Sequence, residues 1–148
     1  MLKKTIKYTD YNGVEREEPF FFHLSKAEIM EMEMGTAGGL AEMIQSIIDS
    51  NNTPEIIKIF KEIILKAYGE KSLDGKRFTK VSDAGVPLSI GFSQTEAYSE
   101  LFMELATDAD AAAKFVQGVI PSDIDISEAQ LKLVGAEVSN VKFEQNNQ

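Results

Sequence analysis

Polar and apolar residues alternate at the start of the chain, in the pattern of two β-strands joined by a turn. The first strand contains the strand-favouring residues Tyr8 and Tyr11 and leads to Asn12-Gly13, a dipeptide that accepts the positive φ angles of a tight hairpin turn. Pro19 cannot donate a hydrogen bond to a sheet, so we expect the second strand to lie at an edge or to bulge there. Residues 3–23 are therefore predicted to form a β-hairpin.

Three consecutive phenylalanines, Phe20 to Phe22, close the second strand. In a strand, Phe20 and Phe22 point to one face and Phe21 points to the other. A two-stranded hairpin is only marginally stable on its own, so helices must cover one of its faces. Phe21 then needs cover on the opposite face, from the rest of the chain, from a partner or from a second copy.

After residue 24, apolar residues recur at spacings of three and four, which predicts helices. Ser25 and Glu28 form a capping box that starts the first helix, and Gly35 ends it. A second helix is expected to begin at Leu40 and to end at Asn51.

The third predicted helix begins at Thr53 and has Pro54 in its first turn, where proline is tolerated. Its broad apolar face consists of Ile56, Ile57, Ile59, Phe60, Ile63, Ile64, Ala67 and Tyr68. A face this wide is typical of a buried helix, so we expect this one to lie at the centre of the core.

Helical periodicity stops in residues 69–91, where turn-forming Gly, Pro, Asp and Ser residues gather. We expect a connecting segment there, with a short strand or a helical turn near residues 77–81. The segment carries a basic cluster of Lys71, Lys76, Arg77 and Lys80. Such a cluster suits an acidic partner, and a solvated loop is the alternative interpretation.

Two further helices are predicted after this segment. Ser93 and Glu96 form a second capping box, and Asp108 caps the last helix, which ends before Pro121. Residues 122–148 form a polar tail that we expect to be flexible unless a partner holds it. The whole pattern predicts an α+β fold that is mainly helical, with an N-terminal β-hairpin packed on a bundle of about five helices.

Composition narrows the possible partners. The 148 residues carry a net charge of −9, which argues against nucleic acid, because phosphates need clustered Lys and Arg, and against an anionic membrane surface. The chain has no cysteine and no apolar run long enough to span a membrane. Its polar N-terminus does not match a signal peptide, so we expect a cytoplasmic protein of one domain.

Candidate chemistry is sparse. His23 is the only histidine, and no spacing supplies the companions of a catalytic triad or a metal site. The glycines of residues 35–39 lack the Lys-Ser or Lys-Thr pair of a phosphate-binding loop. We therefore predict no catalytic, cofactor-binding or metal-binding residue.

Apolar side chains suited to protein binding are more frequent. Six methionines supply adaptable apolar surface, although filling the core is the alternative interpretation. The candidate partner-binding residues are Phe21, Met30, Met34, Tyr98, Phe102 and Phe115.

Three segments, in this order, resemble the tail assembly chaperones of long-tailed (siphovirus-type) phages of Gram-positive hosts. The segments are IKYTDYNGVEREEPFFFHLSKAEIMEMEM, YGEKSLDGKRFTK and FSQTEAYSELFMELATDADAAAKFVQGVIP. That family combines an aromatic-ended hairpin, a YG-x-K-S-x-DG-x-x-F loop and a T-x-AY-x-x-L-F-x-x-L helix. The resemblance covers most of residues 5–121, so residues 1–121 are expected to form the chaperone domain, with residues 122–148 as its tail.

The resemblance implies a non-enzymatic role in virion morphogenesis in the host cell cytoplasm. Proteins of this kind coat the tape measure protein, keep it soluble, help to deliver the major tail protein and are generally absent from the finished tail. Many are also made in a longer, frameshifted form, and self-association is a further expectation. The alternative is a structural tail component retained in the virion, such as a tube or completion protein, which would carry more strand.

Overall fold

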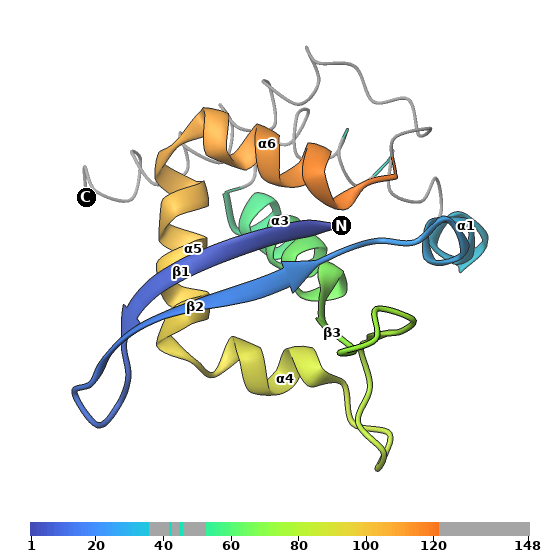
Figure 1. Ribbon diagram of the computed structural model, residues 1–148. Helices are drawn as coiled ribbons and strands as arrows, with labels where there is room; N and C mark the ends of the chain where they lie inside the picture. Colours follow the sequence, from blue (N-terminus) through green and yellow to red (C-terminus); the bar gives the residue numbers. More distant parts are fainter. Residues whose placement is uncertain (36–41, 43–44, 46–52, 122–148) are drawn as a thin grey trace.

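The computed structural model describes residues 1–35, 42, 45 and 53–121. Within these residues an N-terminal β-hairpin lies across a group of helices, as Figure 1 shows, which confirms the predicted α+β class and its mainly helical character. The expected helix from Leu40 to Asn51 and the polar tail of residues 122–148 lie outside the described residues, apart from two isolated positions of the former.

The predicted hairpin is present. β1 (Leu2–Thr9) and β2 (Glu15–Phe22) pair antiparallel, with Leu2 opposite Phe22. In the turn, the Asp10 carboxylate accepts hydrogen bonds from the backbone N–H groups of Asn12 (2.9 Å) and Val14 (3.0 Å). Gly13 adopts a φ of 81°, which an L side chain rarely accepts, so the Asn-Gly dipeptide serves the turn as expected.

Residues 69–91 are more ordered than the sequence analysis predicted. Immediately after a helix, β3 (Tyr68–Lys71) pairs with β2, and β4 (Phe78–Thr79) pairs with β3, so that the sheet has the order β1-β2-β3-β4. The assignment of Tyr68 to a helix was therefore wrong. Tyr68 lies opposite Phe22 in the sheet, and this long-range pairing leaves no signal in local periodicity.

The prediction that the second strand is at an edge near Pro19 is confirmed. On β2, only Phe21 and Phe22 pair with β3. Along the rest of its length, β2 therefore has β1 as its single strand neighbour in the described part of the chain. A proline is tolerated there because no second strand needs its missing N–H group.

The described helices are α1 (Lys26–Gly35), α3 (Thr53–Ala67), α4 (Leu88–Ser93), α5 (Glu96–Thr107) and α6 (Ala109–Val119). The first capping box is confirmed: Glu28 N–H donates to Ser25 Oγ (3.1 Å), and Ser25 N–H donates to Glu28 Oε1 (3.0 Å). Asp108 also caps α6 as predicted, because its carboxylate accepts from the backbone N–H groups of Asp110 and Ala111.

The second capping box was placed wrongly. Ser93 is the last residue of α4, and its hydroxyl donates to the Ile90 carbonyl oxygen (2.7 Å). The N-cap of α5 is instead Thr95, whose hydroxyl oxygen accepts from Tyr98 N–H (3.2 Å). Because Ser93 belongs to the end of α4, its side chain does not cap α5. Thr95 is the next residue along the chain whose side chain can act as the N-cap of α5.

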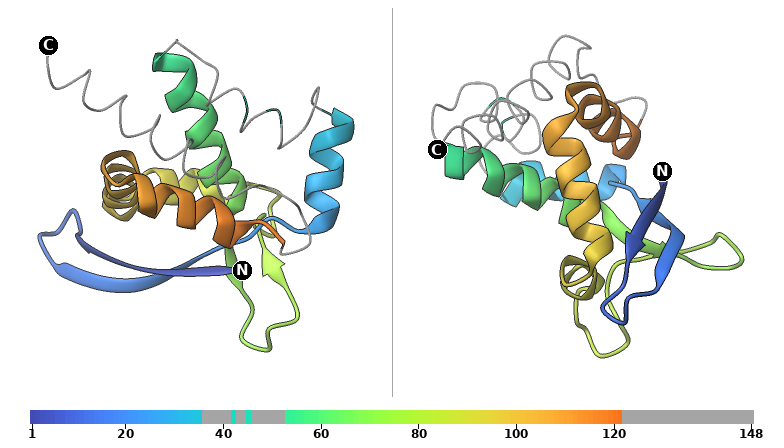
Figure 2. Two further views of the ribbon diagram at one scale, coloured as in Figure 1. Left: turned by 90° about the horizontal axis from the view of Figure 1, so that it is seen from above. Right: turned by 90° about the vertical axis from the view of Figure 1, so that its left-hand side faces the viewer.

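The core lies between the inner face of the sheet and the helices. Phe22 is fully buried, with its ring centroid 5.2 Å from that of Phe115 on α6 and 5.7 Å from that of Phe92 on α4. Phe92 also stacks on Tyr68 at 4.2 Å. Two perpendicular views show α5 between the hairpin and the N-terminal part of α3 (Figure 2). Phe92 also meets the ring of Tyr98 on α5 edge-on at 5.7 Å, so aromatic packing continues from the hairpin into α5.

Candidate partner-binding groove

Tyr98 and Phe102 lie one helical turn apart on α5, with ring centroids 6.1 Å apart. Both side chains are half-buried. Their position follows from the pattern of α5, because Ala97, Leu101 and Leu105 occupy the core side of the helix. The two rings consequently sit at the border between the core and the surface.

These two rings line a groove of about 470 Å³ between α3, α5 and the tip of the hairpin. Ile57 of α3 and Met103 of α5 add apolar surface, and Met103 is 44% exposed. Phe60 of α3 lies beneath the groove, with its ring 6.4 Å from that of Phe102. The groove thus has an apolar lining that rests directly on the core.

The hairpin turn closes one end of the groove. Tyr11 is 75% exposed, and its hydroxyl oxygen lies 3.5 Å from the carbonyl oxygen of Gln94, between α4 and α5. A hydrogen bond with Glu96 raises the pKa of Tyr11. Burial similarly raises the pKa of Tyr98. Both phenols remain protonated at neutral pH, so they offer hydrogen bonds and apolar surface and are not nucleophiles there.

The two sides of the groove carry opposite charges. Lys61 lines it from α3, and Glu96 lines it from α5. An apolar lining between two charged sides is suited to an amphipathic helix, whose apolar face would occupy the groove while its polar flanks meet the charges.

The other expected partner-binding residues lie elsewhere. Phe115 is 2% exposed and packs in the core against Phe22, while Met30 is 63% exposed on α1. The side chain of Met34 lies outside the described residues. Of the five candidates whose side chains the structure describes, only Tyr98 and Phe102 lie in one groove.

Phe21 is on the outer face of the sheet, as its position in the strand predicted. It pairs with Gly69 of β3, whose lack of a side chain leaves room for the ring of Phe78: a Cβ atom at residue 69 would lie 2.5 Å from that ring. The His23 ring meets Phe78 edge-on at 6.0 Å. Phe21 is half-buried in this setting, so the rest of the chain supplies part of the cover that it needs.

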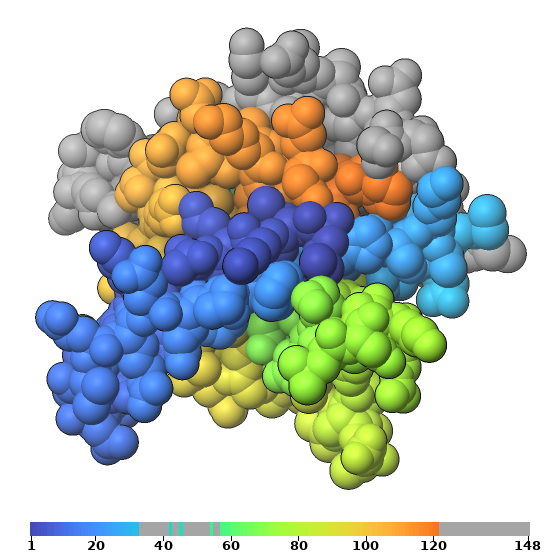
Figure 3. All heavy atoms as spheres, viewed as in Figure 1, coloured from blue at the N-terminus to red at the C-terminus, as the bar shows by residue number. Residues whose placement is uncertain are grey.

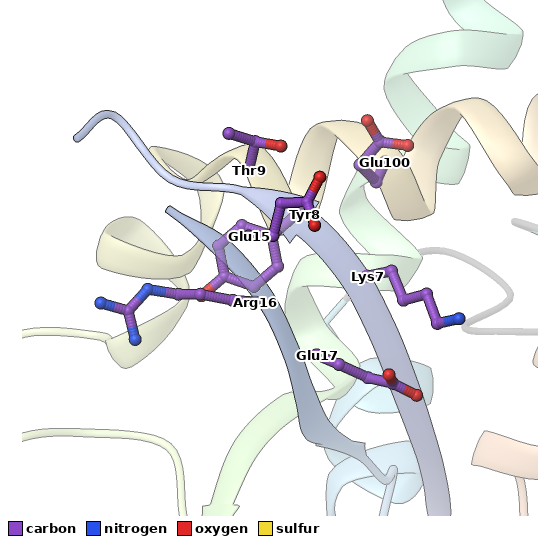
Figure 4. A pocket seen from close by; sticks show the side chains of 7 residues that line it. All are labelled: Lys7, Tyr8, Thr9, Glu15, Arg16, Glu17 and Glu100. Carbon is purple, nitrogen blue, oxygen red and sulfur yellow. The ribbon is translucent and has the colours of Figure 1, made fainter. Parts of the chain in front are cut away.

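A second hollow, of about 530 Å³, lies beside the hairpin and differs in character (Figure 4). The charged side chains of Lys7, Glu15, Arg16, Glu17 and Glu100 line it, together with Tyr8 and Thr9. The Arg16 guanidinium is held by Asp10 at 2.6 Å, and the Tyr8 hydroxyl donates to Glu18. This hollow lacks the apolar lining that a helix-binding groove needs.

His23 lies directly after β2, close enough to Lys80 and Glu28 for their charges to act on it. Its Nδ1 atom is buried there without a hydrogen-bond partner, and burial, the positive N-terminus and Lys80 lower its pKa. Among residues 1–35, 42, 45 and 53–121, no three His, Cys, Asp or Glu side chains are placed to hold a metal ion. Within the same residues, no helix has the length and apolar character to cross a bilayer.

Sequence reasoning missed Tyr11, Ile57 and Met103 as groove residues. Tyr11 was assigned only to a strand, and Ile57 only to the core face of a helix. The sequence did contain part of the signal for the groove, because the spacing of Ile57 and Lys61 places them one turn apart on the same face of α3. Which helix faces them is decided by tertiary packing.

Comparison with known proteins gives one family. The family model described as phage tail assembly chaperone matches residues 1–148. Searches of curated proteins and of solved structures gave no significant match.

Proposed function

Because this chain belongs to the phage tail assembly chaperone family, a non-enzymatic assembly family, we propose that it binds the tape measure protein and keeps it soluble during tail morphogenesis. The observation that supports this most directly is the apolar groove between α3 and α5. A long, helical client exposes apolar stripes before assembly, and a chaperone must cover them reversibly.

In this proposal one amphipathic segment of the client lies in the groove. Tyr98, Phe102 and Met103 supply large, adaptable apolar contacts, and Tyr11 provides a hydroxyl group and a ring at one end. Lys61 and Glu96 then orient the segment through its charged flanks. Binding by one short groove is weak enough to be reversed when the tail tube forms.

The charge of the chain supports a role as a coating protein. A net charge of −9 makes separate copies repel one another in solution, which opposes nonspecific association when many copies cover one client. It also disfavours binding to nucleic acid, which is abundant where phages assemble.

The proposal includes the later steps of assembly. The chaperone helps to recruit the major tail protein, acts in the host cytoplasm and leaves before the virion is complete. A longer, frameshifted form of the chain is also part of the proposal. Phe21 and Met30 are proposed as secondary contacts with protein partners, because both present apolar surface outside the groove.

The alternative is a structural component, such as a tube or completion protein, that stays in the particle. The small amount of strand in the described residues disfavours a tube subunit, because β1 and β2 have eight residues each, β3 has four and β4 has two. Mass spectrometry of purified virions separates the two functions: a stoichiometric amount of this chain in the particle would exclude the chaperone proposal.

The groove is tested by co-expressing the tape measure protein with variants of the full chain. We expect Met103→Lys to reduce the soluble, co-purifying client, because a charge replaces an exposed apolar side chain in the groove. Ile90→Lys is the matched control, since Ile90 is 50% exposed on α4 and does not line the groove. Equal yields with both variants would exclude the groove as the client site.

A further inference from the structure

The loop between β3 and β4 presents a leucine that is completely exposed. Leu73 has a relative exposure of 105%, the highest of the large apolar side chains in the described part of the chain. In this position its side chain adds nothing to the core of its own chain. Removing it from water would favour binding to a partner that has a matching apolar pocket. We define residues 71–77 as the tip.

The tip is held in one conformation by its own hydrogen bonds. Ser72 N–H donates to the Arg77 carbonyl oxygen, and Gly75 N–H donates to the Ser72 carbonyl oxygen, both at 2.9 Å. The Ser72 hydroxyl donates to Asp74 at 2.6 Å and accepts from Arg77 N–H at 3.0 Å. Gly75 has a φ of 74°, which suits glycine. Leu73 is thus presented on an ordered loop, which lowers the entropy lost on binding.

The tip is also basic, in a chain whose net charge is −9. Lys71, Lys76 and Arg77 are all exposed, and Asp74 is the only acidic residue of the tip. A hydrogen bond from the Ser72 hydroxyl lowers the pKa of Asp74, so this carboxylate serves the loop. Within the described residues, neither Lys76 nor Arg77 takes part in a salt bridge. Their charges are therefore available to the carboxylates of a partner.

The next turn of the chain has the same backbone hydrogen bonds but a different surface. Ser82 N–H donates to the Val86 carbonyl oxygen (2.8 Å), and Gly85 N–H donates to the Ser82 carbonyl oxygen (2.9 Å). The apolar residue of this turn, Val86, is only 49% exposed, and its one charged residue, Asp83, is acidic. A fully exposed apolar side chain with a basic rim is therefore a property of the tip and does not follow from the type of turn.

The tip lies apart from the groove between α3 and α5. Figures 1 and 2 show the loop after β3 well away from α5, and Figure 3 shows that loop (green) as a projection. The residues that line the groove include none from the tip. One partner can therefore bind the tip while a client segment occupies the groove.

The shape of the tip indicates the kind of partner. A projecting side chain needs a concave receptor, and an isolated helix offers only a convex surface. Concave pockets with an apolar lining are a feature of folded proteins. Of the two partners in the proposed function, the tape measure protein is the helical client of the groove, and the major tail protein is delivered as separate subunits. The tip suits the second of these partners.

We propose that the tip is a second protein-binding site, which docks into an apolar pocket rimmed by carboxylates on the major tail protein subunit. Leu73 fills the pocket, and Lys76 and Arg77 face the carboxylates. This inference rests on the proposed function, because it assigns one of the two partners to a surface other than the groove. One leucine and its neighbours bury far less than the ~1,600 Å² of a stable interface, so the contact is weak and the subunit can leave for the growing tube.

The test is binding of the purified full chain to purified major tail protein subunits of the same phage, measured by isothermal titration calorimetry. Leu73→Asp should weaken binding by about tenfold or more, because the buried leucine is lost and a carboxylate meets carboxylates. Val86→Asp, the same kind of change in the neighbouring turn, should bind like the unmodified chain. Thermal unfolding of each variant verifies that the fold is unchanged.

The basic rim is tested separately through its charge. Lys76→Glu should weaken binding and make it less sensitive to salt, because salt screens the attraction between exposed charges. Lys58→Glu makes the same change of charge at an exposed residue of α3 and should have a much smaller effect. Equal effects of the two variants would mean that only the net charge of the chain matters, which would overturn the role of the rim.

Failure of this inference differs from failure of the proposed function. The inference predicts that Leu73→Asp loses the major tail protein but still co-purifies with soluble tape measure protein. The tip assignment alone is overturned if the unmodified chain and Leu73→Asp bind the major tail protein equally well, or if the unmodified chain binds only the tape measure protein. An unmodified chain that binds neither protein would overturn the proposed function as well.

Two further results would overturn the inference by giving the tip another partner. Loss of soluble tape measure protein in Leu73→Asp, with unchanged binding of the major tail protein, would assign the tip to the client of the groove. Co-sedimentation with vesicles of phosphatidylserine and phosphatidylcholine that is lost in Leu73→Asp would assign the tip to a membrane surface. The net charge of −9 disfavours the membrane, so we expect no binding to these vesicles.

Discussion

The ammonium group of Lys80 lies 2.5 Å from Glu28 Oε2 and joins two segments that are far apart in the chain. The same Nζ atom donates to the carbonyl oxygens of His23 and Lys66, each at 2.7 Å. Lys80 therefore ties together the end of the hairpin, the start of α1 and the end of α3. Burial lowers the pKa of Lys80. Burial would raise that of Glu28, but hydrogen bonds from Lys80 and Ser25 lower it.

Replacing Lys80 should destabilise the fold. Lys80→Met leaves two carbonyl groups and a carboxylate without their shared donor, which we expect to cost about 1–3 kcal/mol of unfolding free energy. Lys76→Met, in the exposed loop between β3 and β4, should change stability by less than about 0.5 kcal/mol. Urea unfolding followed by circular dichroism measures both. Equal stabilities would mean that the Lys80 contacts add nothing to the fold.

The stability of the fold should depend on pH, because the pKa of the single histidine, His23, is shifted by folding. The folded-state pKa of His23 is lowered, chiefly by burial, so the unfolded chain binds a proton first as the pH falls. Stability should therefore decline from about pH 7.5 to 5.5, a window that brackets the ordinary histidine pKa of about 6.5. His23→Gln should remove this decline in urea unfolding at the two pH values. An unchanged decline in the variant would assign it to other groups.

Two glycines give opposite expectations for the same substitution. Gly69→Ala places a Cβ atom 2.5 Å from the Phe78 ring, so the ring must move away, and we expect a loss of about 1–3 kcal/mol. Gly91→Ala in α4 meets no atom within 4 Å and should stabilise by about 0.4–1 kcal/mol. Thermal unfolding of the two variants should shift in opposite directions, and shifts of the same sign would contradict the packing of Phe78 over β3.

Two of the three phenylalanines proposed from the sequence as partner-binding residues, Phe21 and Phe115, should behave differently when they are replaced. Phe115→Ala removes a core ring that is 2% exposed, so we expect a loss of about 3–5 kcal/mol. Phe21→Ser should weaken client binding or self-association more than it lowers the unfolding temperature, because the ring is only half-buried on the outer face. Parallel losses of binding and stability in Phe21→Ser would make this residue part of the core.

Much of the fold could be predicted because its signals are local. The Asn12-Gly13 turn, the Ser25–Glu28 capping box and the Asp108 cap each involve residues within one turn of chain, and the structure confirms all three. β3 could not be predicted in the same way. Tyr68 and Gly69 are in a strand because they pair with Phe22 and Phe21, about 47 positions earlier, and such pairing leaves no periodicity. The other two residues of β3 pair with β4.

Only the α5 side of the candidate groove could be predicted from the sequence. Tyr98 and Phe102 share a face of α5, which their spacing shows. The opposite side of the groove comes from Ile57 and Lys61 on α3 and from Tyr11 in the hairpin turn, and only tertiary packing brings these segments together. The sequence could not show whether Phe115 lies in the core or on a binding surface, because its position on an apolar stripe is typical of both.

The central claim is that the groove between α3 and α5 holds a protein client. The most direct measurement is the amount of soluble tape measure protein that co-purifies with the full chain when Phe102→Ser and the unmodified chain are compared at matched folded concentration. The groove proposal predicts that the unmodified chain keeps the client in solution and that the variant loses most of it. A client that stays equally soluble with both proteins, or that never forms a complex with either, would contradict it.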